Sequence, residues 1–448
     1  MSRELILGIL LEVTRDGQYS HIALSNVLSK YQYLDKKERA FITRVTEGTL
    51  EHMIEIDYII NQFSNVKVNK MKPVIRCILR SAVYQLKYMD FVPDAAVCNE
   101  AVKLAEKKGF RTLKGFVNGV LRNIARNLDN ITYPDKTDDI NFLSIRYSMP
   151  VWILKQWLAC YDKETVEKML EDFLKEKPTT IRCNLNIMSK EELKQSLEKE
   201  GVHVENHPYL PYALWISSYD YLADLESFRE GAFYVQDISS MLVAHIADPE
   251  ENDVVIDVCA APGGKSLHIA ELLHGSGHVE ARDLTDYKVG LIQENIFRSG
   301  AQNIEAMKWD ATVLDEASAE KADIVVADLP CSGLGVLGKK TDLKYKMTQE
   351  TQKELVLLQR EILSKVQSYV KPDGTLIYST CTIHAGENME NVHWFLKEYP
   401  EFELVPIADC LCKELKESVQ EEGCLQLLPG IHKSDGFFIA KFRKVKHG

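Results

Sequence analysis

The sequence contains no apolar run long enough to cross a bilayer, and its first residues lack the apolar core of a secretory signal. Both absences argue against a membrane or exported protein. The ten cysteines are scattered rather than gathered in a disulfide framework, so we expect a reducing, cytoplasmic environment. Cys410, Cys412 and Cys424 lack a second paired set of ligands, and we therefore expect no metal site.

The remaining composition is that of a globular protein, with 45% apolar and 27% charged residues. A chain of 448 residues is long enough for two or three domains, each with its own core. Residues 1–130 contain 20 basic and 14 acidic side chains, whereas the remainder contains 34 basic and 52 acidic ones. The net charge of −12 therefore hides a basic first part of the chain.

Apolar side chains recur at helical spacing throughout residues 1–130, which predicts an all-α domain without a catalytic constellation. Its charge imbalance is greatest in 101–126, where seven basic residues stand against Glu106 alone. A basic face of this kind suits a phosphate backbone, and a merely solvated helix face is the competing interpretation. The candidate contacts are Lys103, Lys107, Lys108, Arg111 and Lys114.

A polar, turn-rich segment at 127–139 predicts a linker after this domain. In 140–232, helical patterns alternate with short strand-like runs at 180–184 and 213–217, which predicts a small α/β module.

Strands and helices then alternate regularly from 233 to 448. The expected strands are 253–258, 278–283, 304–309, 323–328, 374–380, 402–405 and 436–443. The longest expected helices are 285–299, 349–369 and 386–398. This alternation predicts a parallel, doubly wound α/β sheet that binds its ligand at the carboxyl ends of the strands.

The stretch 254–266, VVIDVCAAPGGKS, forms the first strand of this part and the turn after it. The turn passes through Pro262, Gly263 and Gly264 into an expected helix. Paired glycines allow close approach of a ligand, and the free amides of a helix start favour polar or anionic groups. Asp283, twenty residues after Gly263, ends the next strand, where a carboxylate accepts hydrogen bonds from ribose hydroxyls. The stretch therefore predicts a cofactor cradle.

Two other kinds of nucleotide site are excluded by what this stretch lacks. A P-loop requires glycine at position 259, where the chain has Cys259. A dinucleotide site requires G-x-G-x-x-G, which the stretch does not contain. An ordinary strand-to-helix turn remains as the alternative, and the other strand ends argue against it.

Polar or reactive side chains follow five of the expected strands. They are Cys259 to Lys265, Asp283, Asp310, Asp328 with Cys331, and Cys381. Because the carboxyl ends of parallel strands meet at one edge, the last two cysteines could project into a single crevice. A thiolate is a strong nucleophile, and positive charge or a helix start favours its formation.

Several motifs coincide with these strand ends. They are DVCAAPGGK at 257–265, DLPCSG at 328–333 and YSTCT at 378–382, with FYVQD at 233–237 and DGFF at 435–438. Together they resemble the RNA cytosine-C5 methyltransferases that use S-adenosylmethionine. The first part of the chain resembles a NusB-type helical domain in YQL at 84–86, VP at 92–93, NEAV at 99–102 and FVNGVLR at 116–122. The combination is similar to the bacterial small-subunit (16S) ribosomal RNA methyltransferase B family.

The resemblance implies three domains: a NusB-like RNA-binding domain at 1–130, an RNA-binding α/β module at 140–232, and a Rossmann-like methyltransferase domain at 233–448. It implies methylation of C5 of one cytosine in 16S ribosomal RNA. The expected partner is RNA, with no role for DNA or a membrane, and we expect a monomer.

The resemblance also implies roles for the strand-end residues. Cys381 is expected to add to C6 of the cytosine, Cys331 to take part in product release, and Asp328 to contact both cofactor and base. The other residues expected to bind S-adenosylmethionine are Cys259, Ala260, Ala261, Pro262, Gly263, Gly264, Lys265, Asp283 on the ribose and Asp310 near the adenine. Covalent addition agrees with the chemistry, because C5 of cytosine is a poor nucleophile unaided.

Three alternatives remain open at this point. In the DNA cytosine enzymes the cysteine of a Pro-Cys pair attacks, which here is Cys331. The same chemistry could act on transfer RNA, or the chain could be an inactive RNA-binding module. One segment, 338–345, departs from relatives that carry an Arg-rich, Pro-containing stretch ending in Trp, and its RNA contacts or stiffness are expected to differ.

Overall fold

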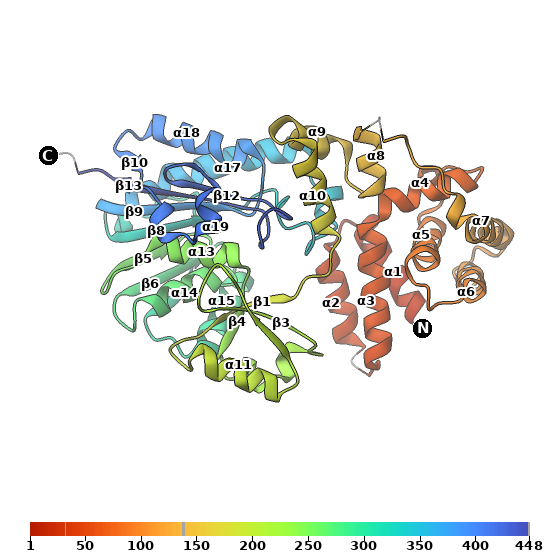
Figure 1. Cartoon of the computed structure of the whole chain (residues 1–448), viewed down its shortest axis with the longest axis horizontal. Coiled ribbons are helices and arrows are strands. Elements are labelled where there is room, and N and C mark those ends of the chain that lie inside the picture. The colour runs from red at the N-terminus through yellow and green to blue at the C-terminus, as the bar shows by residue number, and fades with distance from the viewer. Residues whose placement is uncertain (32, 137–138, 447–448) are drawn as a thin grey trace. The chain divides into compact units, whose positions relative to one another are not determined.

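The computed structural model describes residues 1–31, 33–136 and 139–446, which form two compact units (Figure 1). The helical unit is Met1–Leu174 together with Leu337–Met347, and the sheet unit is Lys175–Val336 together with Thr348–Gly448. The three predicted domains do not coincide with these units, because residues 140–174 group with the helical unit and 175–232 with the sheet unit. Within the described ranges, every helix is too short or too polar to cross a bilayer.

The helical unit confirms the all-α prediction for the first part of the chain. Its α-helices are α1 (Ser2–Thr14), α2 (Ser20–Lys30), α3 (Lys36–Glu51), α4 (Met53–Phe63), α5 (Pro73–Tyr88), α6 (Asp94–Lys107), α7 (Lys114–Arg126), α8 (Asp139–Arg146), α9 (Val151–Cys160), α10 (Lys163–Phe173) and α16 (Leu343–Lys346). The apolar stripe of α1 is buried at Ile6, Ile9 and Leu10, as its spacing predicts. Asp35 caps α3 by accepting a hydrogen bond from the Glu38 amide at 2.8 Å.

The segment 337–347 leaves the sheet unit shortly after Cys331 and packs among the N-terminal helices. Asp342 accepts hydrogen bonds from the amide and hydroxyl of Ser20, at 3.0 and 2.7 Å, and so satisfies the free amide at the start of α2. Lys344 donates to the Glu51 carbonyl at 2.8 Å, and burial lowers the pKa of its ammonium. The segment that departs from its relatives in sequence is thus part of the helical unit.

A small antiparallel sheet begins the sheet unit. Its strands, in the order β2-β3-β1-β4, are β2 (His203–Asn206), β3 (Ala213–Ser217), β1 (Thr179–Cys183) and β4 (Phe233–Val235). Its helices are α11 (Lys190–Lys199) and α12 (Glu226–Arg229). The buried Arg182 of β1 donates to Gln236 at 2.8 Å and pairs with Glu271, which lies in the helix after the predicted cofactor turn. This pair ties the small sheet to the larger one.

The large sheet has the order β11-β12-β13-β9-β8-β5-β6-β7, with β10 beside β13. Its strands are β5 (Val254–Asp257), β6 (His278–Asp283), β7 (Ile304–Lys308), β8 (Ala322–Asp328), β9 (Val370–Thr380), β10 (Phe402–Leu404), β11 (Val419–Glu421), β12 (Cys424–Leu427) and β13 (Phe437–Lys444). Only β5 to β9 are parallel. The prediction of a fully parallel sheet was therefore wrong for the strands beyond β9, where β13 runs antiparallel. Nine residues join β12 to β13, and so short a connection favours an antiparallel pair over a crossover.

Helices cover both faces of the parallel strands, which confirms the doubly wound prediction. The helices are α13 (Ile238–Ala247), α14 (Gly264–Leu272), α15 (Asp286–Ser299), α17 (Gln349–Val366), α18 (Met389–Glu398) and α19 (Lys413–Lys416). Val255, Val326 and Ile377 share a buried cluster with α13, α14 and α15. Ile256, Val325 and Leu376 share the opposite cluster with α17 and α18. Successive strand residues thus alternate between two apolar layers.

Candidate active site

The predicted site residues lie at one edge of the sheet, where the parallel strands end. Asp283 and Asp328 are the last residues of β6 and β8, and Cys381 directly follows β9. The register pairs Asp257 with Ala281 and with Val326, and Asp328 with Ser379. The strand ends that the sequence singled out are therefore adjacent in the sheet.

The turn between β5 and α14 is tight, and its shape depends on glycine. Gly263 has φ +103°, and a Cβ there would lie 3.3 Å from Ile292. The Ala261 amide donates to Asp283 Oδ2 at 3.0 Å, and the Leu284 amide donates to Oδ1 at 2.8 Å. Asp283 therefore fixes the turn, and its carboxylate still has lone pairs for a ligand hydroxyl.

Asp257 also stabilises this turn, although the sequence analysis did not identify it as a site residue. Ser266 of α14 donates to its Oδ2 at 2.6 Å. Burial raises the pKa of Asp257 to about 7, against the opposing effect of the Ser266 hydrogen bond. Its place at the end of the first parallel strand was the available sequence signal.

Lys265 connects the cofactor turn to the cysteine-bearing strand ends. Its Nζ lies 2.7 Å from Asp328 Oδ2, and Ser379 donates to Asp328 Oδ1 at 2.7 Å. Although burial opposes it, the Asp328 carboxylate holds the pKa of the Lys265 ammonium above its usual value. The same ammonium interacts electrostatically with the Cys381 sulfur. The site therefore contains a cation that Asp328 fixes and that interacts electrostatically with Cys381.

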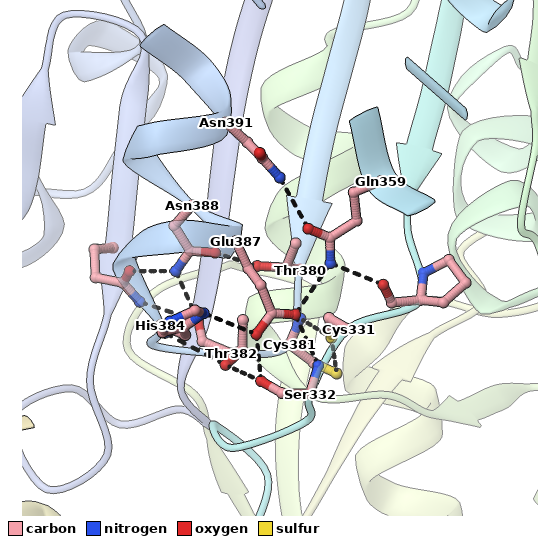
Figure 2. A network of polar contacts seen from close by, with 12 residues as sticks. Cys331, Ser332, Gln359, Thr380, Cys381, Thr382, His384, Glu387, Asn388 and Asn391 are labelled. Carbon is pink, nitrogen blue, oxygen red and sulfur yellow. Dashed lines mark hydrogen bonds and ion pairs between the residues drawn. The ribbon is translucent and has the colours of Figure 1, made fainter. Parts of the chain in front are cut away.

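The two cysteines predicted to share a crevice do lie together. Their sulfurs are 2.9 Å apart, and the Cys381 amide points to the Cys331 sulfur at 3.2 Å (Figure 2). The contact with Cys381 and burial raise the pKa of the Cys331 thiol well above its usual value. Burial and neighbouring carboxylates likewise raise the pKa of the Cys259 thiol. Neither Cys331 nor Cys259 therefore readily becomes a thiolate.

Asp310 lies two residues beyond the end of β7, and its side chain is exposed. Its Oδ1 accepts hydrogen bonds from the amide and hydroxyl of Thr312, at 2.9 and 2.7 Å. These hydrogen bonds lower the pKa of Asp310, which is therefore ionised at neutral pH.

The predicted RNA contacts lie in the helical unit, and each has a carboxylate partner. Lys107 and Lys108 hold the two oxygens of Glu4 at 2.8 and 2.7 Å. The remaining pairs are Lys103 with Glu100, Arg111 with Glu106, and Lys114 with Glu106 at 4.0 Å. The surface is exposed, but its cations are partly neutralised, and Glu4 lies about a hundred residues before the lysines that it binds.

Three family models match the chain. They are described as 16S rRNA methyltransferase RsmB/F at residues 244–443, the NusB family at 1–126, and an RsmF/B-like ferredoxin-like methyltransferase domain at 149–220. The last of these spans parts of both compact units.

Named relatives match over nearly the whole chain. A probable ribosomal RNA small subunit methyltransferase B of Bacillus subtilis is 37% identical over 99% of this chain and 98% of its own length. A ribosomal RNA small subunit methyltransferase B of Cronobacter sakazakii is 29% identical over 99% and 98%.

Two solved structures are similar as well. The crystal structure of PH0851 has a TM-score of 0.83 at 26% identity, covering 99% of this chain and 98% of that one. The structure of NSun6 from Pyrococcus horikoshii with SFG has a TM-score of 0.57 at 25% identity, covering 64% and 96%.

Proposed function

The chain belongs to the 16S rRNA methyltransferase RsmB/F family, and on that premise we propose that it methylates C5 of a cytosine in 16S ribosomal RNA through a covalent bond from Cys381 to C6. The methyl donor is S-adenosylmethionine. One observation carries the proposal: two thiols lie 2.9 Å apart at the sheet edge, next to the Lys265–Asp328 pair. A structural cysteine needs neither a second thiol nor a fixed cation beside it.

The residues after β5 fit a nucleoside cofactor. The Gly263 turn permits close approach of a ligand, α14 begins directly after Gly263, and Asp283 ends the neighbouring strand. We propose that residues 259–265 hold the cofactor, with Asp283 on its ribose hydroxyls and Asp310 near its adenine. When bound, S-adenosylmethionine supplies the methyl group as an electrophilic sulfonium.

Cys381 is the proposed nucleophile because the Lys265 ammonium, which Asp328 fixes, interacts electrostatically with it, and a cation favours a thiolate. A bond from its sulfur to C6 of the cytosine shifts electron density to C5, which can then accept a methyl group. Loss of the C5 proton restores the ring and expels the sulfur. The target base must first be unpaired or flipped, since C6 is inaccessible within a stacked helix.

Cys331 is proposed to act in release rather than in attack. The contact with Cys381 and burial raise the pKa of the Cys331 thiol, which favours its protonated form. Its sulfur touches Cys381, where the C6–S bond must break. Asp328, held by Lys265 and Ser379, is proposed to contact the cytosine edge.

The helical unit is proposed to bind the RNA phosphate backbone through the surface that contains Lys103, Lys107, Lys108, Arg111 and Lys114. We propose action as a monomer in the cytoplasm, on RNA and not on DNA.

The test is transfer of labelled methyl from S-adenosylmethionine to deproteinised 16S ribosomal RNA and, in parallel, to transfer RNA, with Cys381→Ala as the blank. Label in ribosomal RNA that appears as 5-methylcytidine and is absent with the variant supports the proposal. Label only in transfer RNA keeps the chemistry and contradicts the substrate. Absence of label in both RNAs, despite cofactor binding, favours the inactive RNA-binding module.

A further inference from the structure

Two consecutive buried residues, Glu387 and Asn388, hold the turns that carry the two cysteines. The turns follow β8 and β9, and they also contact each other at their next residues, where the hydroxyls of Ser332 and Thr382 lie 2.8 Å apart (Figure 2). Glu387 and Asn388 are 0% and 1% exposed and lie between β9 and α18. We refer to these two residues as the clamp.

Glu387 holds the residue after Cys331 directly and the residue before it through Gln359. Its Oε2 accepts from the Ser332 amide at 2.8 Å, and its Oε1 accepts from the Ser332 hydroxyl at 2.5 Å. Gln359 of α17 donates at once to Glu387 Oε2 at 3.0 Å and to the Pro330 carbonyl at 2.8 Å. The residue after Cys331 is therefore fixed to the carboxylate, and the residue before it is fixed to the amide that donates to this carboxylate.

Asn388 binds both sides of Cys381. Its Oδ1 accepts from the Thr380 hydroxyl at 2.6 Å, and its Nδ2 donates to the Thr382 carbonyl at 3.0 Å. A second bond from Nδ2 to Gln426 of β12, at 2.8 Å, fixes the amide plane. Neighbouring residues of one short segment thus each hold one cysteine.

Burying these polar side chains costs free energy unless each polar atom has a hydrogen-bond partner. A buried carboxylate without partners is strongly disfavoured, and Glu387 has three donors on its two oxygens. Gln359 is itself oriented by Asn391, whose amide donates to its Oε1 at 2.9 Å. The side-chain hydrogen bonds of the clamp end on residues next to a cysteine, on Gln359 or on Gln426, and His384 pairs with Glu387 Oε1 at 3.2 Å.

We propose that Glu387 and Asn388 are positioning residues that hold the two sulfurs where both can reach the same cytosine. Glu387 acts on the release step by positioning Cys331, and Asn388 acts on the attack by positioning Cys381. The inference rests on the proposed function, because it assigns the two residues to separate steps of that reaction. Rate losses of about 100-fold follow from displacements near 1 Å in such sites.

The test compares Glu387→Gln and Asn388→Ala in single-turnover methyl transfer and in recovery of the covalent protein–RNA adduct on a denaturing gel. In Glu387→Gln the group that faces the Ser332 hydroxyl becomes a donor, and the bond to the Ser332 amide loses its charge, so the Cys331 turn is held more weakly. We expect slower turnover with the KM for S-adenosylmethionine unchanged, and roughly tenfold more adduct. For Asn388→Ala we expect roughly tenfold slower adduct formation without accumulation.

The matched control is Asp323→Asn, which makes the same change of carboxylate to amide at the opposite end of β8, where Asp323 pairs with Lys371. It should behave as the wild type in both assays. Variants that match the wild type, or that lose adduct, rate and thermal stability in parallel, would overturn the proposal. Should Glu387→Gln not fold, Gln359→Met removes the bonds of residue 359 to Pro330 and to Glu387 but keeps the two bonds from Ser332 to the carboxylate. It should also raise the adduct; no rise overturns the proposal.

A wild type that forms neither methylated RNA nor adduct would contradict the proposed function, and the clamp is then tested without RNA. Diamide takes one hydrogen from each of two thiols and joins the sulfurs as a disulfide. We expect rapid loss of two titratable thiols in the wild type, traced by peptide mass to Cys331 and Cys381, and loss several-fold slower in both clamp variants. Equal rates would overturn the clamp by itself.

Discussion

The Nζ of Lys265 lies 2.7 Å from Oδ2 of Asp328, and this contact joins the cofactor turn to the strand that ends before Cys331. The other Asp328 oxygen accepts from Ser379, two residues before Cys381. A single ion pair therefore links the ends of β5, β8 and β9. Its position makes it the most informative place to perturb the site without touching either cysteine.

Substitution of Lys265 by methionine should lower methyl transfer by about 100- to 1,000-fold, because it removes a preorganised cation from beside the thiol and Asp328. The measurement is the single-turnover rate with saturating cofactor. Lys371→Met is the matched control, since Lys371 lies at the same 2.7 Å from Asp323 at the opposite end of the sheet. Equal losses in both variants would mean that Lys265 acts only on stability.

Substitution of Asp283 by alanine should weaken binding of S-adenosylmethionine by roughly 10- to 100-fold, because the hydrogen bonds proposed to the ribose and the anchor for the Ala261 amide are lost together. Calorimetric titration of the cofactor measures this directly. Asp286→Ala removes an exposed carboxylate three residues later, paired with Lys308, and should leave the affinity unchanged. An unchanged affinity for S-adenosylmethionine in Asp283→Ala would show that Asp283 does not bind the cofactor.

The buried Asp257 should make the stability of the protein fall as pH rises from about 4 to about 7. Burial raises its pKa from 3.8 to about 7, so the folded state retains a proton that the unfolded state releases. The contribution of Asp257 to the free energy of unfolding is fully present below pH 4 and is lost as the pH passes 7. The melting temperature of Asp257→Asn, followed from pH 4 to 8, should lack this fall. An identical profile in the variant would contradict the assignment.

Glu4→Gln should strengthen RNA binding, because it frees Lys107 and Lys108 from the carboxylate that each now binds. The salt dependence of binding should steepen, by about one unit for each additional phosphate that the two lysines neutralise. Charge reversal at Lys107, Lys108 and Arg111 should have the opposite effect on both quantities. Affinity and slope that do not change in either variant would show that this face is only solvated.

The fold of the sheet unit was largely predictable, because alternating strands and helices leave a strong periodic signal. The strands at 254–257 and 278–283 and the residues at their ends follow directly from that alternation. The antiparallel strands 419–421 and 424–427 were missed, since they are short and follow one another without a helix between them. Local pattern does not record such pairings.

Long-range contacts explain what else the sequence did not reveal. Glu387 and Asn388 occupy a segment expected only to begin a helix, and their role depends on turns up to 57 residues earlier in the chain, including Pro330. The basic residues at 103–114 were predictable as a charged face, but their neutralisation by Glu4 and Glu100 depends on packing.

The most direct test of the account is recovery of the covalent protein–RNA adduct from Cys381→Ala and Cys331→Ala, incubated separately with 16S ribosomal RNA and S-adenosylmethionine. We expect no adduct from Cys381→Ala, which lacks the proposed nucleophile, and an accumulated adduct from Cys331→Ala, which cannot complete release. An adduct that persists in Cys381→Ala and vanishes in Cys331→Ala would contradict it and identify Cys331 as the nucleophile.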